Sequence, residues 1–213
     1  MTSLNMKKAS LILSVVVITT LMMTSCGERD KEVKIGDQIW MAENLNVDKF
    51  RNGDPIPHAK TDEEWIKAGE EGMPAWCYYD NDEKMGAKYG KLYNWYAVND
   101  SRGLAPKGWE VPSDAEWTQL TDFVGSNPGT KLKAKSGWSR NGTDDYGFSA
   151  LPGGVRSRSG KFGYVGNKGY WWSSTETSAY DVWHRGMHYK LSGVSRGNFS
   201  KSSGFSVRCV RDF

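Results

Sequence analysis

Glycine and aromatic residues occur in this chain at a density that few folds accommodate. The chain has 24 glycines together with 10 Trp, 10 Tyr and 7 Phe, and all of them lie after residue 25. Glycine costs about 1 kcal/mol at each site in a helix interior, which excludes a long-helix bundle or a coiled coil. So many large rings can bury ample apolar surface, which excludes a disordered chain. We expect a loop-rich domain with short strands and an aromatic core.

The first 25 residues differ in kind from the rest. Lys7 and Lys8 precede an apolar run from Leu11 to Ile18, which is too short to span a bilayer and is typical of a secretory signal. The residues just before Cys26 resemble the lipobox of bacterial lipoproteins, in which the cysteine is lipidated and becomes the first residue of the mature protein. We therefore expect a signal peptide over residues 1–25 and a lipid on Cys26. An ordinary cleaved signal beside an unrelated cysteine is the alternative.

Residues 26–32 have the composition of a solvated tether, because after the cysteine they are all small or charged. Several acyl chains, each contributing about 0.8 kcal/mol per buried methylene, would make a durable membrane anchor. An acidic flank after such a cysteine also resembles the surface-export signal of Bacteroidota lipoproteins. We expect an outer-membrane lipoprotein facing the cell surface, with a periplasmic orientation as the alternative.

The net charge argues against a nucleic-acid partner. Of the 28 basic residues, Lys7 and Lys8 lie in the leader, which leaves 26 basic against 25 acidic residues after it. A domain this close to neutral gives no electrostatic case for binding nucleic acid, which needs a clustered basic face.

Two capping boxes predict two short helices. The first, Thr61-Asp62-Glu63-Glu64, predicts a helix that ends near Gly69. The second, Ser113-Asp114-Ala115-Glu116, is followed by an apolar stripe at i, i+3 and i+7 before Gly125.

Strand signals lie at both ends of the remaining chain. Residues 33–40 alternate around a Gly-Asp turn, which predicts a hairpin. Further short strands are predicted at 148–151, 169–174, 180–183, 187–191 and 205–210. The interpretation is a single α+β domain over residues 33–213, with two short helices packed on a twisted, mainly antiparallel sheet with long loops.

Six strings of residues carry a family resemblance. They lie at 40–45, 89–98, 102–117, 147–154, 172–176 and 206–210. In this order they resemble the Fibrobacter succinogenes major paralogous domain over about residues 33–212. That family is similar in pattern to the C-type lectin-like fold and to the sulfatase-modifying-factor group. The shared elements are a Pro-Ser-x-x-Glu-Trp helix start and a closing Arg-Cys-Val strand. The resemblance implies a C-type lectin-like fold and little about activity.

The resemblance also bears on the cysteines. In many relatives a cysteine near the position of Ala105 could pair with the cysteine of the last strand, but here Ala105 cannot. Once Cys26 is lipidated, Cys77 is the one partner left for Cys209. A disulfide between them is compatible with an exported protein, and two buried free thiols are the alternative.

Catalytic and metal signals are sparse. Cys209 has no second cysteine nearby, so the oxidation chemistry of formylglycine-generating enzymes, which use a closely spaced pair, is not implied. His184 and His188 have a spacing that could hold zinc on a helix, but their flanks alternate like a strand, which would separate them by more than 13 Å at about 3.3 Å per residue. Asp80 and Asp82 are calcium candidates in a polar loop, with a plain surface turn as the alternative. We expect no other cofactor and no enzyme activity.

Binding is the function class that the sequence favours. The segment from Ser178 to Ser203 is rich in aromatic and adaptable polar residues, which suit contact surfaces, and aromatic faces also stack on sugar rings. The candidate ligand-binding residues are Tyr180, Trp183, His184, Arg185, His188, Tyr189, Arg196 and Asn198. Ordinary edge-strand and turn residues are the alternative.

The hypothesis is a surface lipoprotein that binds a glycan or a protein in adhesion or recognition. A structural component of the cell envelope or of a pilus is the alternative, followed by a glycan-active enzyme.

Overall fold

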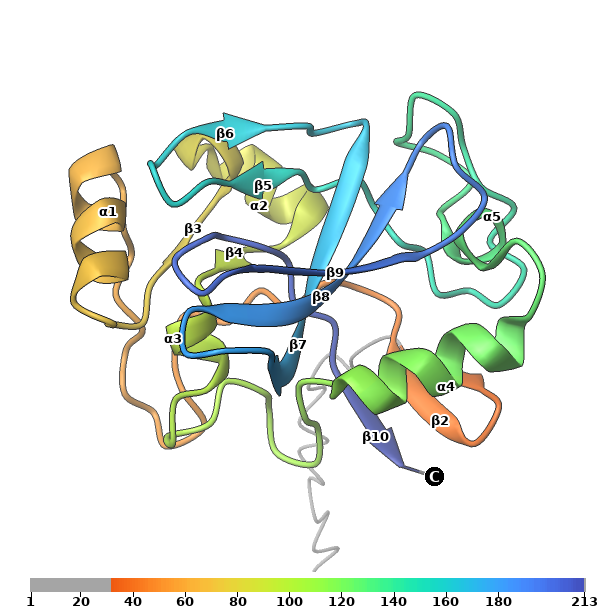
Figure 1. The fold of residues 1–213 in the computed structure, drawn as a ribbon, viewed down its shortest axis with the longest axis horizontal. Coiled ribbons are helices and arrows are strands. Elements are labelled where there is room, and N and C mark those ends of the chain that lie inside the picture. Colours follow the sequence, from red (N-terminus) through yellow and green to blue (C-terminus); the bar gives the residue numbers. More distant parts are fainter. Residues whose placement is uncertain (1–31, 213) are drawn as a thin grey trace, which may run out of the picture.

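The computed structural model describes residues 32–212, which form an α+β domain of short elements (Figure 1). The strands are β1 (Glu32–Ile35), β2 (Gln38–Met41), β3 (Trp76–Cys77), β4 (Leu92–Tyr93), β5 (Val155–Arg156), β6 (Phe162–Gly163), β7 (Lys168–Glu176), β8 (Asp181–His188), β9 (Ser195–Ser200) and β10 (Val210–Asp212). The helices are α1 (Asp62–Glu70), α2 (Glu83–Tyr89), α3 (Trp95–Val98), α4 (Asp114–Val124) and α5 (Pro128–Leu132), with a 3₁₀ turn at Tyr79–Asn81. Within these residues no helix is long and apolar enough to cross a membrane.

The first and last strands of the domain meet in one sheet of order β1-β2-β10. β1 and β2 form the predicted hairpin, and Gly36 takes the positive φ of +63° that its turn requires. β10 pairs antiparallel with the other edge of β2, where Val210 lies opposite Trp40. The two ends of the domain are therefore adjacent.

The longest strands form a second antiparallel sheet of order β7-β8-β9. Side chains alternate between its two faces, so neighbouring tryptophans of β7 enter different cores. Trp171 packs in a cluster with Trp117 of α4 and with Phe148, while Trp172 packs in another cluster with Phe205 and other residues of the closing segment. The sheet thus separates two aromatic cores.

Both predicted helices are confirmed as α1 and α4. Each begins with a complete capping box, at Thr61 and at Ser113, in which side chain and backbone exchange hydrogen bonds. The apolar stripe of α4 is buried as expected. Within this stripe, the indole Nε1–H of Trp117 donates a hydrogen bond to the carbonyl oxygen of Trp172 at 3.2 Å. Gly125 ends α4 with φ +68°.

The expectation of two helices and one sheet is wrong in number. Three further helices, α2, α3 and α5, are present, and the strand ladders divide into four small antiparallel sheets. These helices have only four to seven residues, and they carry little apolar periodicity that could reveal them.

Four of the predicted strands also need correction. One continuous strand, β8, replaces the two strands predicted at 180–183 and 187–191, because Gly186 pairs with Tyr170 of β7 and with Ser195 of β9. Residues 148–151 form a single bridge at Ala150 instead of a strand, since Ser149 has φ +52°. In the closing segment, a regular strand begins only at Val210. β9 was not predicted, because its sequence Ser-Arg-Gly-Asn-Phe-Ser is polar and mostly exposed.

Candidate functional site

The predicted ligand-binding residues do not form a single surface, because β8 distributes them over two faces. Along β8, Trp183 and Arg185 point to the face that α4 covers, and His184 and His188 point to the opposite face. The two histidines lie on one extended strand, as the alternation of their flanks predicted. Within residues 32–212 no group of three or more His, Cys, Asp or Glu side chains is placed to hold a metal ion.

Two of the predicted arginines bind one carboxylate at the start of α4. Arg185 is only 2% exposed, and its guanidinium donates to Asp114 and to Thr118 Oγ1. Arg196 donates to both carboxylate oxygens of Asp114 at 2.9–3.1 Å. Partial burial acts to raise the pKa of the Asp114 carboxyl, but the hydrogen bonds from Arg196 and Arg185 outweigh it, so that pKa lies below its usual range. These arginines therefore fix α4 against the sheet.

The side chains of Trp183 and His184 also make close contacts with other residues of the protein. The guanidinium of Arg196 lies 3.4 Å from the ring centroid of Trp183, a close cation–π contact. His184 is 7% exposed among the rings of Tyr170, Phe199 and Phe205. Burial, followed by the charge of Arg185, lowers the pKa of His184 to about 4, so the imidazole is neutral at physiological pH.

Tyr180 and Asn198 lie at the surface, outside the groove that contains His188. Tyr180 is 81% exposed in the turn before β8, about 25 Å along the strand from His188 at 3.3 Å per residue. Asn198 is an exposed residue of the edge strand β9, opposite Trp183.

His188 lines an open groove of about 320 Å³ at the far end of β8, which we call the turn groove. Its lining residues are Lys168, Tyr170, Gly186, Met187, His188, Lys190, Leu191 and Ser195. The volume is at the lower end of those of small-molecule sites, and the lining combines an aromatic ring and aliphatic side chains with a few polar groups. Among the predicted ligand-binding residues, His188 lies in this groove.

The groove is held open by close packing beneath it. The ring of Tyr170 stacks on Phe205, with centroids 4.9 Å apart, so its position is fixed before any ligand arrives. Gly186 adds no side chain to the floor, where a Cβ would come within 2.6 Å of Ser195 Oγ and 3.4 Å of the Tyr170 ring. Ser195 Oγ donates to the carbonyl oxygen of Gly186 at 3.0 Å. The arrangement is therefore pre-formed.

A second hollow of about 370 Å³, the turn hollow, adjoins the groove and contains the predicted residue Tyr189. Its lining residues are Thr130, Lys133, Arg140, Asn141, Tyr189, Lys190, Leu191 and Ser192. Lys133 Nζ donates to the carbonyl oxygens of His188 and Leu191 at 3.2 and 3.0 Å, which joins α5 to the β8–β9 turn. The two depressions share Lys190 and Leu191 and lie side by side.

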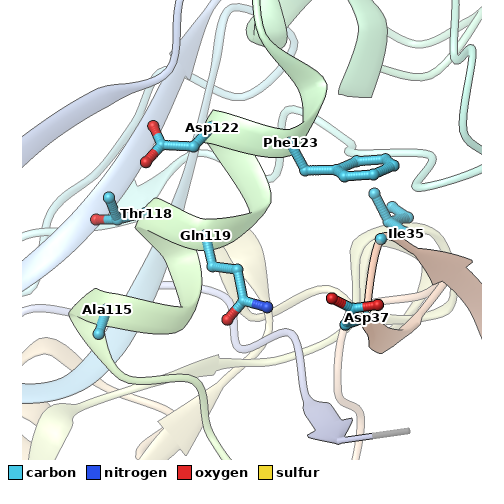
Figure 2. Close-up of a pocket in the computed structure, with 8 residues that line it drawn as sticks. Ile35, Asp37, Ala115, Thr118, Gln119, Asp122 and Phe123 are labelled. Carbon is cyan, nitrogen blue, oxygen red and sulfur yellow. The ribbon is translucent and has the colours of Figure 1, made fainter.

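A different hollow, of about 590 Å³, lies between α4 and the β1–β2 turn (Figure 2). The Phe123 side chain extends from α4 toward Ile35, and Gln119 points toward the turn that carries Asp37. Phe123 is 55% exposed, yet its ring covers Gly36, where a Cβ would come within 2.9 Å. This ring holds the hairpin turn, and none of the predicted ligand residues reaches the hollow.

The calcium candidates lie at the start of α2 and in the turn that precedes it. Asp82 caps α2, since its carboxylate accepts a hydrogen bond from the Lys84 backbone N–H at 2.9 Å. Asp80 lies in the preceding 3₁₀ turn with φ +53°. Both side chains are exposed.

Cys77 and Cys209 are both fully buried, and the disulfide between them that the resemblance left open is not formed in this structure. They belong to different core clusters, Cys77 with Trp65 and Cys209 with Trp95. Burial raises the pKa of the Cys77 thiol to about 12. Cys26 lies outside the described residues.

A comparison with protein-family models matches the Fibrobacter succinogenes major domain to residues 33–211. The chain belongs to this family. A search of curated proteins finds no match. The six strings that carried the resemblance all lie within the matched range. In the folded Fibrobacter succinogenes major domain, several of them meet around Arg208. This fully buried arginine donates to Asn44 Oδ1 at 2.8 Å and to the carbonyl of Met41 at 3.0 Å. The strings that carried the resemblance therefore include residues of the buried scaffold.

Most of the groove was not identified from the sequence. Lys168 and Tyr170 belong to β7, and they reach the groove only because β7 pairs with β8, where Lys168 lies opposite His188. Lys133 and Arg140 come from the region of α5, more than 45 residues before the β8–β9 turn. The available signal for a strand was the alternation of Lys168 and Tyr170 beside a pair of tryptophans. The sequence did not show which other strand would pair with it.

Proposed function

We propose that this protein is a surface-exposed, lipid-anchored recognition protein that binds a glycan in the turn groove. The finer fold assignment, a C-type lectin-like domain, is part of the same proposal. It is supported by the helix start Pro112-Ser113 and the closing Cys209-Val210 segment, the elements common to the resemblance, which here form the start of α4 and of β10.

The observation that carries the proposal is the fixed aromatic floor of an open groove. The ring of Tyr170 is held in place by stacking on Phe205. Leu191, which also lines the groove, is 59% exposed, and packing in the core does not account for an apolar side chain in this position. Sugar rings present apolar C–H faces that pack on such surfaces, while their hydroxyls bond to polar rim groups such as Ser195 and His188. A pre-formed site of this kind loses little conformational entropy on binding.

The position of the groove fits a membrane-anchored protein. The segment after Cys26 leads directly into β1, which pairs with β2. In Figure 1 the β8–β9 turn lies beside α5 at the upper right, whereas β2 and β10 lie along the lower part of the view. The tether therefore joins the domain at a different sheet from the one that carries the groove.

A glycan array with the full-length protein in detergent micelles tests the proposal. Tyr170→Leu keeps an apolar side chain against Phe205 but removes the ring, and Leu191→Ala removes an exposed contact. We expect both variants to lose binding while Tyr180→Ala, which changes an exposed ring outside the groove, retains it. Circular dichroism would show that each variant is folded. Absence of any glycan ligand, with the same envelope proteins captured by crosslinking in wild type and Tyr170→Leu, would favour the structural role instead.

A further inference from the structure

The rim and walls of the turn groove and turn hollow are basic and contain no acid. Their combined lining includes Lys133, Arg140, Lys168 and Lys190 together with His188, and no Asp or Glu. Residues after the leader are nearly balanced in charge, with 26 basic against 25 acidic side chains. The positive charge here is thus a local concentration and not a general property of the domain.

These four cations differ from most arginines of the domain in having no carboxylate partner among the residues that the structure describes. Arg102, Arg156, Arg185, Arg196 and Arg211 all form ion pairs with acids. Within residues 32–212, no ion pair involves any of the four cations around the turn. Lys133 is buried and donates to two backbone carbonyl oxygens of the turn. The charges of Lys168, Lys190 and Arg140 are therefore left for solvent or for a ligand to neutralise.

Neighbouring groups hold two of these lysines at the groove. Lys168 Nζ lies 4.0 Å from the ring centroid of Tyr164, and Lys190 Nζ lies 5.4 Å from that of Tyr189. Burial lowers the pKa of His188, and so does the positive charge of three neighbouring lysines. These are Lys168, Lys190 and Lys133. The direction of this effect agrees with an uncompensated positive potential at the groove.

We propose that the turn groove and turn hollow form one binding surface for an acidic glycan, a chain of sugars carrying carboxylate or sulfate groups. This inference rests on the proposed function and names its ligand class. Tyr170 and Leu191 contact the apolar faces of the sugar rings, while Lys168, Lys190 and Arg140 bind the anionic substituents. Since the two depressions share Lys190 and Leu191, one chain can pass from the groove into the hollow.

The test compares four probes with the full-length protein in neutral detergent micelles. Oligogalacturonate carries carboxylates, heparin oligosaccharides carry sulfates as well, a glucan oligomer is uncharged, and polyglutamate is an acidic polymer without sugar. The double variant Lys168→Glu/Lys190→Glu reverses two groove charges. Its matched control, Lys84→Glu/Lys107→Glu, makes the same change of net charge at exposed lysines outside the site. If the charge-reversal variant gives a lower yield of folded protein, Lys168→Gln/Lys190→Gln removes the two positive charges without adding negative ones.

We expect one or both acidic glycans to bind wild type, and binding to weaken by about tenfold or more in the groove variant. The control should stay within about twofold, and added salt should weaken binding of the acidic probe. Equal affinity of the groove variant and the control would overturn the inference. The inference would also be overturned if polyglutamate bound as tightly as the glycans and did so independently of Tyr170, because the surface would then recognise charge alone. If the glucan binds through Tyr170 without regard to the lysines, the acidic ligand class is wrong while the proposed function stands. If no glycan binds, both fail.

Discussion

Arg185 on β8 donates hydrogen bonds both to the carboxylate of Asp114 and to its backbone carbonyl, and so ties the first residue of α4 to the middle of the sheet. The charge of Arg185 is almost fully removed from water, which is costly without a partner. Arg196 on the adjacent strand binds the same carboxylate from its exposed side. One acidic residue thus connects a helix to two strands.

Replacement of Asp114 by Asn should destabilise the domain strongly. The variant leaves Arg185 buried without a counter-charge, so we expect the free energy of unfolding to fall by about 3 kcal/mol. Urea denaturation followed by tryptophan fluorescence measures this change. Asp122→Asn on the same helix is the control, since Asp122 is exposed and should shift the stability by less than about 0.5 kcal/mol. Similar small changes in both variants would show that the Arg185 pair contributes little.

The stability of the domain should decline as the pH falls from 7 to 5. His184 has a pKa of about 4 in the fold, below its ordinary value of 6.5. In this range the unfolded chain takes up a proton that the folded chain does not, so acidification favours unfolding. The contribution of His184 is about 2 kcal/mol between pH 7 and pH 5. Burial also lowers the pKa of His58 and of His188, which adds to the effect in the same direction.

The variant His184→Leu separates this contribution from the rest. Its free energy of unfolding, measured by urea denaturation at several pH values, should depend less steeply on pH between 7 and 5 than that of wild type. The lowered pKa values of Asp62, Asp100 and Asp114 act only at lower pH, where protonation removes the stability of their ion pairs. An unchanged slope in His184→Leu would mean that the pKa of His184 is the same in the folded and the unfolded chain.

Local sequence signals predicted the elements whose cause is local. α1 and α4 begin within the capping boxes that predicted them, and the β1–β2 hairpin forms around Gly36 because that turn needs a positive φ. β9 carries no such signal, since its polar residues are stabilised by pairing with β8 along a sheet edge. Elements that depend on a distant partner could not be predicted from their own residues.

The candidate site shows the same division. A composition rich in Tyr, Trp, His and Arg led to the segment 178–203, but composition does not tell which side of a strand a residue occupies. Arg185 and Trp183 face α4, and their role follows from Asp114, which lies about 70 residues earlier. The groove itself arises where β7, β8 and the β8–β9 turn meet, and its basic character comes from lysines in different parts of the chain.

Both buried cysteines should resist thiol reagents in the folded protein. The fold excludes solvent from Cys77 and Cys209, and the pKa of Cys77 is raised to about 12, so very little thiolate is present at neutral pH. We expect the variant Cys26→Ser, purified without reductant, to show no rapid reaction with Ellman's reagent. After denaturation in guanidinium chloride, both thiols should react. No reaction after denaturation would demonstrate the disulfide that this structure lacks.

Cys26 is predicted to carry the membrane anchor, because a signal-like leader ends at it and a charged tether follows. Cys26→Ser removes the acyl attachment site, so we expect the variant to leave the detergent-rich phase in a Triton X-114 partition, whereas wild type enters it. Cys77→Ala is the matched control, since its cysteine is buried in the domain and should not affect partitioning. Mass spectrometry of the amino-terminal peptide should find acyl groups on Cys26 in wild type and in the control. An unmodified Cys26 with wild type in the aqueous phase would contradict the prediction, and the groove would then belong to a protein without this anchor.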